Sequence, residues 1–401
     1  MQDRAHGGLE RSLSLPVFTL YGVGTMVGAG FYALLGEVAE RSGAATPLAF
    51  ALAAVVGLLS AISFGELSTR MPVSAGEARY VREAFGRPFW AGLTGWAVIA
   101  TGLVSAATLS VAFARFLREL GGPPETAAIL GFVVVTTTVA ALGVAHAARV
   151  AVAITLLEVG GLLVVLASAA PRVDAEGLTA VLGAGLGDGL AGAALGGAFL
   201  ALYAFVGFED MVNLAEEVRE PERNLRRGLY AAFAITATLY VVVAVVALAA
   251  VGPETLAASR SPLAAVVGGR GGWLLTAIGL AAGCNGALMQ IVMASRVAYG
   301  LGSGGAGVQA MPRALAVVHP RTRTPVRATL VGGAIVLALA TSLPLDRLAE
   351  VTSAIILLVF TAVHASAWRL LGREGASLRR RVVPAVGGIA SLGFLVGRLL
   401  F

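Results

Sequence analysis

GVGTMVGAG, at residues 22–30, places four glycines inside the first long apolar run of the chain. Each glycine weakens a helix by about 1 kcal/mol relative to alanine, because its backbone can take many other conformations. Such a cluster lets the backbone unwind within a membrane span. We therefore expect a break from Met26 to Gly30, with a second half-helix starting near Phe31.

Glycine clusters also occur where helices pack tightly and in nucleotide-binding loops. Gly24 and Gly28 have the small-xxx-small spacing that brings membrane helices close together, so tight helix packing remains an alternative. A dinucleotide-binding loop does not fit. Its third glycine would have to fall one position earlier than Gly28, and no strand precedes the stretch.

The composition indicates that lipid is the main solvent of this chain. Hydrophobic residues make up 57% of the 401 residues and charged residues only 13%, whereas soluble domains carry about 25% charged residues. Apolar runs of about 20 residues, long enough to cross a bilayer, recur along the sequence. Alternating segments typical of a barrel are missing. The sequence predicts an all-α polytopic membrane protein with about eleven spans, at 16–39, 47–69, 90–118, 126–145, 149–170, 189–214, 228–251, 271–300, 327–343, 346–370 and 382–400.

The arginines indicate how the chain is oriented. All 29 basic residues are arginine, and most fall in segments that share one side if the N-terminus is cytoplasmic. We therefore expect a multi-pass protein of the inner (plasma) membrane with a cytoplasmic N-terminus. This use of the basic residues argues against nucleic acid as a partner. One cysteine, Cys284, and four scattered histidines predict no intrachain disulfide and no metal site.

A second interrupted run, GGAFLALYAFVGFED at 196–210, opens the sixth predicted span. Matched broken helices at the start of two five-span halves are typical of an inverted repeat with a binding site at the membrane midplane. The expected organisation is a cytoplasmic N-terminal segment (1–15), a first repeat (16–170), a second repeat (189–370) and an additional C-terminal transmembrane helix (382–401).

The two breaks offer complementary chemistry. The first amides of a half-helix lack internal partners and carry the positive end of the helix dipole, so Gly28, Ala29 and Gly30 could bind a carboxylate. Free carbonyls in an unwound stretch from Tyr203 to Gly207 would suit an ammonium group. An amino acid has both groups, whereas a polyamine lacks the carboxylate.

Carboxyl groups inside the spans are costly, and most of them are functional. Glu158 lies in an apolar run with no basic residue nearby, so it could carry a proton or ligate Na⁺; a permanently protonated, hydrogen-bonded glutamate is the alternative. Glu209 and Asp210 follow the second break directly, and either could instead pair with an arginine at the cytoplasmic mouth. Asn285 could line the pocket or bond a neighbouring helix.

Several motifs resemble the amino acid–polyamine–organocation superfamily of permeases, in the right order over nearly the whole chain. They are the glycine segment 22–32, the loop motifs ELSTRMP (66–72) and GEARYVREAFG (76–86), FVGFE (205–209) with EEVREPERNL (216–225), and SRVAY (295–299) with the prolines that follow it.

The resemblance implies the leucine-transporter fold, a five-plus-five inverted repeat and alternating access. It implies that the substrate carboxylate binds at Gly28, Ala29 and Gly30. The amine would bind backbone carbonyls, and Glu209 would act at a gate or contact the substrate side chain. The carbonyls concerned are those of Met26, Tyr203, Ala204 and Val206.

The chain also departs from the pattern of this superfamily. Many members carry a lysine at the position of Glu158, most have twelve spans, and a hydroxyl often present near Ala29 is missing. The expected function is a secondary active amino acid transporter, proton-coupled through Glu158, without a resident cofactor. An ion-independent amino acid or polyamine exchanger is the alternative, and a membrane-embedded enzyme or a non-transporting sensor or partner subunit are weaker ones.

Overall fold

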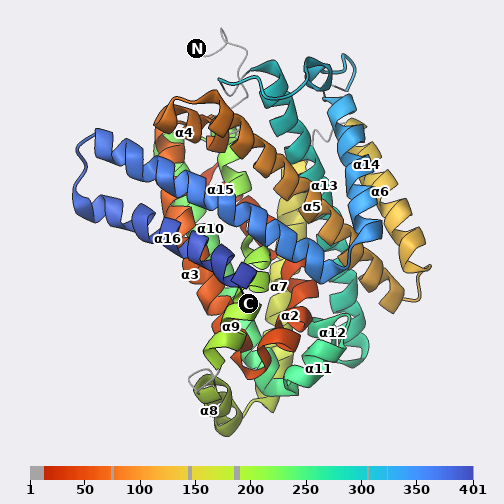
Figure 1. Ribbon diagram of the computed structural model, residues 1–401. Helices are drawn as coiled ribbons and strands as arrows, with labels where there is room; N and C mark the ends of the chain where they lie inside the picture. Colours follow the sequence, from red (N-terminus) through yellow and green to blue (C-terminus); the bar gives the residue numbers. More distant parts are fainter. Residues whose placement is uncertain are drawn as a thin grey trace.

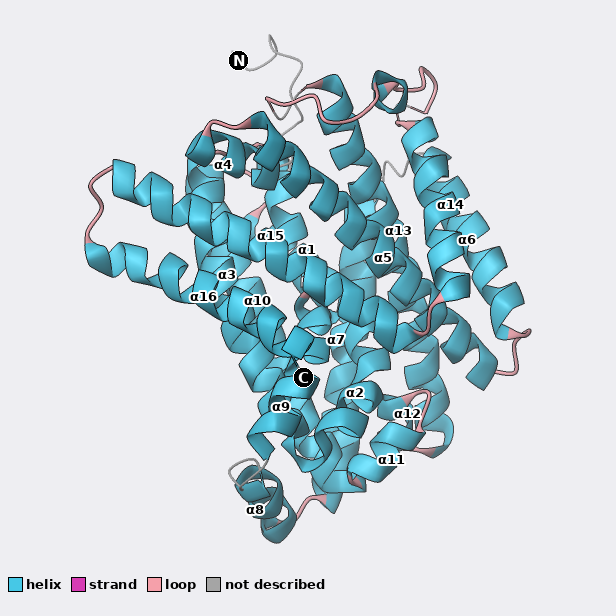
Figure 2. Cartoon of the chain, viewed as in Figure 1, coloured by secondary structure: helices cyan, strands magenta, loops and turns pink. Residues whose placement is uncertain are grey.

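The computed structural model is built of helices (Figure 1). It describes residues 13–400 except 74–75, 143–146, 185–189, 305–306 and 323, so most of the predicted N-terminal segment lies outside the described residues. Within them no strand forms, and Figure 2 shows helices joined by short loops. The α-helices are α1 (Leu15–Val27), α2 (Ala29–Ser42), α3 (Thr46–Arg70), α4 (Gly76–Phe85), α5 (Pro88–Glu119), α6 (Glu125–Leu142), α7 (Ala147–Ala169), α8 (Ala175–Ala184), α9 (Leu190–Ala201), α10 (Pro221–Val251), α11 (Pro253–Ala258), α12 (Pro262–Val267), α13 (Gly269–Ser303), α14 (Val326–Ser342), α15 (Leu345–Arg373) and α16 (Leu378–Leu400). Short 3₁₀ turns include η3 (Leu202–Phe205) and η4 (Glu209–Glu217).

The helices are long and apolar enough to make this a multi-pass membrane protein. Among the described residues, nine stretches could cross a bilayer by length and composition. The first of them, Leu15–Arg70, contains both α1–α2 and α3, and α14 is a shorter apolar helix. The all-α polytopic class is confirmed, while the number eleven and the inverted repeat stay predictions.

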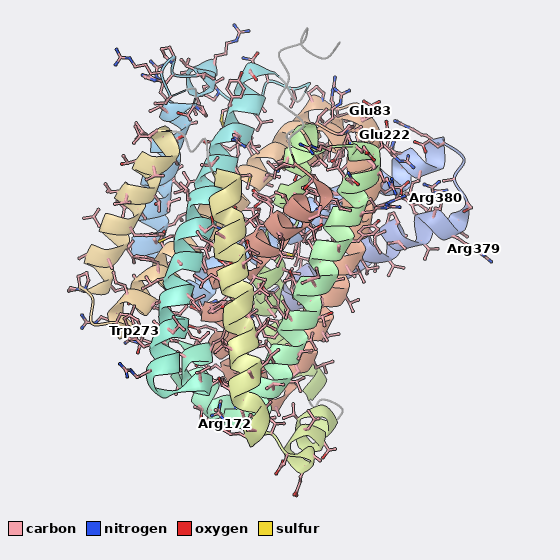
Figure 3. All side chains as sticks on the ribbon, turned by 180° about the vertical axis from the view of Figure 1, so that it is seen from behind. Glu83, Arg172, Glu222, Trp273, Arg379 and Arg380 are labelled. Carbon is pink, nitrogen blue, oxygen red and sulfur yellow. The ribbon has the colours of Figure 1, made fainter. Side chains whose placement is uncertain are left out.

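Charged side chains gather at the two ends of the bundle. In Figure 3, Glu83, Glu222 and Arg380 lie at one end and Arg172 lies at the other. Ion pairs at the first end join α3 to α15 and α16, through Arg70 with Glu374 and Glu66 with Arg380. The start of α10, the end of α15 and the start of α16, all predicted to be cytoplasmic, therefore share one face.

The first span is broken, as the glycines predict, but over a shorter stretch than expected. α1 ends at Val27, and only Gly28, with φ −37° and ψ −172°, leaves helical geometry before α2 begins at Ala29. The expected start near Phe31 is therefore wrong by two residues. One non-helical residue is enough to end the hydrogen-bonded ladder of α1 and begin another.

The sixth span is broken more extensively. α9 ends at Ala201 and is followed by η3, by an extended Val206 and by Gly207 at φ 124°. The chain continues as the 3₁₀ turn η4 rather than as an α-helix. A Cβ atom on Gly207 would lie 2.6 Å from the carbonyl oxygen of Thr25. Glycine is thus required here by both the positive φ and the close approach of α1.

Replacing Gly207 by alanine should therefore push the two breaks apart. We expect Gly207→Ala to destabilise the protein by about 2 kcal/mol more than Gly121→Ala. Gly121 is the matched control, because it has φ 83° and no atom within 4 Å of the place that a Cβ would take. Thermal unfolding in detergent measures the difference, and equal unfolding temperatures for the two variants would contradict this role.

Candidate functional site

The two breaks share a small internal cavity. Its lining includes six of the residues predicted for the substrate site, namely Met26, Gly28, Gly30, Tyr203, Val206 and Asn285. The cavity has a volume of about 20 Å³, which is room for little more than one water molecule. An amino acid therefore requires the surrounding helices to move apart.

The donor side of the cavity is the start of α2. The amides of its first turn have no partner within the helix, and the positive end of the helix dipole lies there. The N–H of Gly28 itself donates to the carbonyl of Gly24 at 3.3 Å. Donors for a carboxylate therefore begin at Ala29, whose side chain lies outside the described residues, and continue with Gly30.

The acceptor side is partly occupied by the protein itself. The Tyr240 hydroxyl lies 2.6 Å from the carbonyl oxygen of Met26 and 3.1 Å from that of Ala204, and the carbonyl of Tyr203 accepts the N–H of Val206 at 3.0 Å. Each carbonyl oxygen has two lone pairs, so each retains capacity for an ammonium group.

Tyr240 is the residue at the two breaks that the sequence analysis did not predict. It lies in α10, fully buried, with its ring stacked on Phe31 at 4.1 Å. Its hydroxyl bridges both breaks. The sequence did contain a signal for this role. Tyr240 lies in the apolar run LYVVVAVV (239–246), and a buried tyrosine hydroxyl usually finds a hydrogen-bond partner.

Glu158 lies on α7, fully buried, and both of its carboxyl oxygens lack a hydrogen-bond partner among the described residues. Its backbone carbonyl accepts the Tyr32 hydroxyl at 2.6 Å, which connects α7 to α2. It does not line the cavity. A charge on this carboxyl would be unpaired in a low-dielectric interior, at a cost of several kcal/mol.

Glu209 is buried and follows the second break at the start of η4. Its Oε2 accepts the N–H of Gly207 at 2.9 Å, and Glu209 is not part of the cavity lining. The neighbouring Asp210 is connected to the cavity through Gln290. Its Oδ2 accepts from Nε2 of Gln290 at 2.8 Å, and Gln290 lines the cavity.

Among the described residues, no group of three or more histidine, cysteine, aspartate or glutamate side chains is arranged to hold a metal ion. The chemistry available at the site is therefore that of backbone dipoles, hydroxyls, amides and buried carboxyls.

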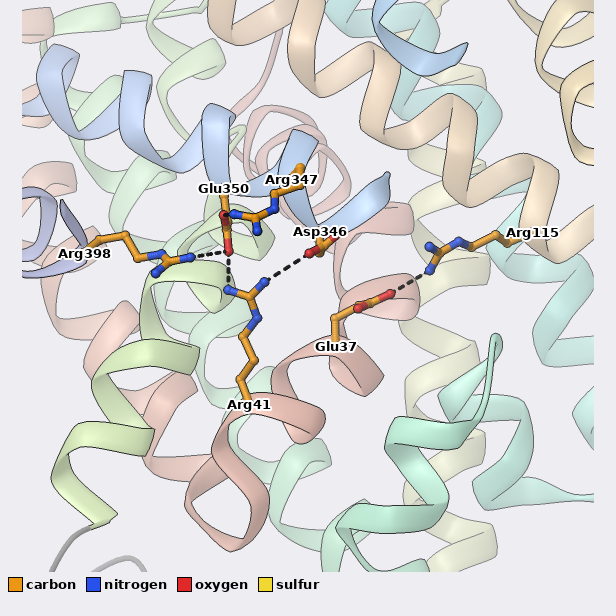
Figure 4. A network of polar contacts seen from close by, with 7 residues as sticks. All are labelled: Glu37, Arg41, Arg115, Asp346, Arg347, Glu350 and Arg398. Atoms are coloured by element: carbon orange, nitrogen blue, oxygen red, sulfur yellow. Dashed lines mark hydrogen bonds and ion pairs between the residues drawn. The ribbon is translucent and has the colours of Figure 1, made fainter. Parts of the chain in front are cut away.

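A network of ion pairs lies at the end of α2 that is far from the break (Figure 4). Arg41 contacts Asp346 and Glu350 on α15, and Glu37 accepts from Arg115 on α5 at 2.6 Å. Arg398 of α16 donates to Glu350 at 2.9 Å. The pairs of Arg41 and Glu37 tie α2 to α15 and α5, so α2 cannot leave these two helices without breaking several charge-assisted bonds.

Comparison with known proteins decides the family, because the family model described as "Amino acid permease" matches residues 13–401. The chain belongs to the amino acid permease family. It is thereby a member of the amino acid–polyamine–organocation superfamily that its motifs resemble. The broken helices and the cavity between them are thus features of a permease.

Several permeases and transporters are similar over most of this chain. An uncharacterized transporter of Mycobacterium tuberculosis is 33% identical over 94% of this chain and 84% of its own length. The branched-chain amino acid permease BcaP of Bacillus subtilis is 26% identical over 96% and 86%. A vacuolar cationic amino acid transporter 4 of Arabidopsis thaliana is 27% identical over 88% of this chain and 62% of its own length.

Removing the Tyr240 hydroxyl should loosen the two breaks. We expect Tyr240→Phe to speed amide hydrogen exchange in residues 202–208 about fivefold, because one net hydrogen bond is worth about 1 kcal/mol. Tyr230→Phe is the matched control, since Tyr230 also lies on α10 but its hydroxyl donates to the carbonyl of Ile62 on α3 at 3.3 Å, away from the breaks. Mass spectrometry measures the exchange. An unchanged exchange rate in Tyr240→Phe would contradict the proposed bridging of the two breaks by this hydroxyl.

Breaking the ion pairs of α2 should open that end of the cavity. In a Cys284→Ser background, a cysteine placed at the cavity residue Leu109 should react faster with a membrane-impermeant maleimide when Arg41 is changed to alanine. The control is Arg347→Ala, because Arg347 also contacts Glu350 but lies on the same helix. Equal labelling rates in the two variants would show that the network does not hold α2.

Proposed function

We propose that this permease is a secondary active transporter that moves amino acids across the plasma membrane by alternating access. The observation that carries the proposal is the meeting of the two breaks at one cavity, with free amides at the start of α2 and carbonyls of Met26 and Val206 opposite. An α-amino acid offers a carboxylate to the first set and an ammonium to the second.

The organisation predicted from the sequence supports this proposal. We propose two five-helix repeats, 16–170 and 189–370, with an additional helix at 382–401, and a cytoplasmic N-terminus. Relatives named for branched-chain and for cationic amino acids make both classes candidates for the cargo. The transport cycle would alternate between opening at the ion pairs of α2 and opening at the other end of the cavity.

Coupling to protons through Glu158 is the second part of the proposal. A carboxyl group without any hydrogen-bond partner among the described residues is tolerated in this interior when it is protonated and becomes costly when it is charged. Loss of the proton would favour a state in which water reaches α7. Proton movement and helix movement would thereby be linked.

Uptake into proteoliposomes tests the proposed function. Radiolabelled L-leucine and L-arginine are offered separately with an inward proton gradient, and at least one of them should accumulate. Glu158→Gln should abolish the accumulation driven by the gradient while exchange between equal concentrations continues. Gradient-driven uptake by Glu158→Gln at the wild-type rate would contradict proton coupling through this residue.

The same experiment distinguishes the proposed proton-coupled transporter from the main alternative, an ion-independent exchanger. An exchanger without ion coupling would show labelled uptake only when unlabelled amino acid is inside, and the proton gradient would have no effect on the wild type. Absence of uptake for every amino acid offered, with or without internal amino acid, would contradict the transport function itself.

A further inference from the structure

A buried amide, that of Gln290, connects the cavity to the carboxyl of Asp210. Gln290 lines the cavity and donates through Nε2 to Oδ2 of Asp210. Glu77, on the short helix α4, is also buried and lies close enough for the charge of Asp210 to act on it. Glu77 and Asp210 are only 1% and 5% exposed.

Two oxygen atoms in this group lack a partner. Oε1 of Glu77 and Oε1 of Gln290 are buried without a hydrogen bond in the part of the chain that the structure describes. Gln290 is 5% exposed, and its amide already points at Asp210. An unsatisfied buried acceptor destabilises the folded state. A protonated carboxyl can donate as well as accept, because it gains an O–H group.

The acidic groups around Glu77 all disfavour a further negative charge. Burial is the main reason that the pKa of Glu77 rises to about 8; a hydrogen bond to its own backbone opposes this, and the charge of Asp210 adds to it. Glu209 lies beside Asp210, and the fully buried Tyr80 hydroxyl on α4 has no partner among the described residues.

The arginines of α4 and α15 are engaged elsewhere. Arg79 pairs with Glu83 at 3.6 Å, and Arg82 donates to the carbonyl of Gly86. From α15, Arg369 lies over the ring of Phe85 and Arg373 donates to the carbonyl of Glu83. Glu374, which follows α15, pairs with Arg70.

Within the described residues, neither α5 nor α13 adds a cation beside the group. α5 has no charged residue from 88 to 114, and α13 has none from 271 to 295. Arg296, which follows on α13, is exposed, as are Arg226 and Arg227 at the start of α10.

We propose that Glu77, Asp210 and Gln290 form a proton-binding site below the cavity, separate from Glu158, in which Glu77 and Asp210 hold one proton between them. The proton neutralises one carboxyl, and the remaining charge is stabilised by the amide of Gln290. The ligand of this site is therefore a single proton.

The site has a consequence for transport, which rests on the proposed function. Glu77 belongs to α4, outside the membrane-spanning helices, at the end of the bundle where Glu83 lies (Figure 3). Opening this end would hydrate Glu77 and remove the burial that holds the proton. The proton would then leave on the side predicted to be cytoplasmic, in step with the opening.

Infrared titration of the full protein in liposomes tests the site without any substrate. The wild type should show a protonated carboxyl band that disappears with a midpoint near pH 8. Glu77→Gln should lack this component. Glu83→Gln is the matched control on the same helix, because Glu83 is exposed and paired with Arg79, and it should keep the component unchanged.

Asp210→Asn gives a second measure that does not depend on how well Glu77→Gln folds. Removing the neighbouring charge should move the midpoint to lower pH, because the proton on Glu77 then relieves less repulsion. A wild-type titration in Glu77→Gln, or an unchanged midpoint in Asp210→Asn, overturns the proposal. Since neither readout uses an amino acid, these outcomes are independent of the uptake result.

Thermal unfolding measured at several pH values checks the direction of the pKa shift of Glu77. Between pH 4.5, the ordinary value for a glutamate, and about pH 8, the folded state keeps a proton that the unfolded state has lost. Stability should therefore fall as pH rises through this window, and Glu77→Gln should show a smaller fall than Glu83→Gln. Equal pH dependence in the two variants counts against the site.

Discussion

Two interrupted helices can border one cavity only if their backbones come close, and in this permease they meet at Gly207 and Thr25. A Cβ atom at residue 207 would lie 2.6 Å from the Thr25 carbonyl, and the hydroxyl of Thr25 lies 3.0 Å from the carbonyl of Gly207. Tyr240 adds a bridge between Met26 and Ala204. The orientation of amides and carbonyls around the cavity depends on this crossing.

The low dielectric of the interior is the second constraint, and it explains the polar residues. An unpaired charge is expensive there, so a carboxyl is either paired or protonated. Glu350 follows the first course, with three arginines around it. Glu158 and the group of Glu77 and Asp210 have no such cations among the contacts described above. Carboxyls without a paired cation, such as Glu158, suit proton binding. Carboxyls in ion pairs, such as Glu350, suit a gate that opens and closes.

The sequence predicted the helical membrane class and the positions of both breaks, because glycine clusters and apolar runs are local signals. It placed Met26, Gly30 and Tyr203 at one cavity through the matched breaks. It did not predict the bridge by the Tyr240 hydroxyl, since this depends on contacts between distant segments. The hydrogen bond from Gly207 to Glu209 was also not predicted, because it depends on the exact geometry of the second break. The start of α2 was missed by two residues because glycine permits unwinding without fixing its length.

The central claim is that the two breaks bind the amino acid, one through amides and the other through carbonyls. A cryo-EM structure of the protein with bound amino acid tests it most directly. We expect the carboxylate within hydrogen-bond distance of the first amides of α2, and the ammonium beside the carbonyls of Met26 and Val206. An amino acid seated elsewhere, or bound at the cavity with neither group on the breaks, would contradict it.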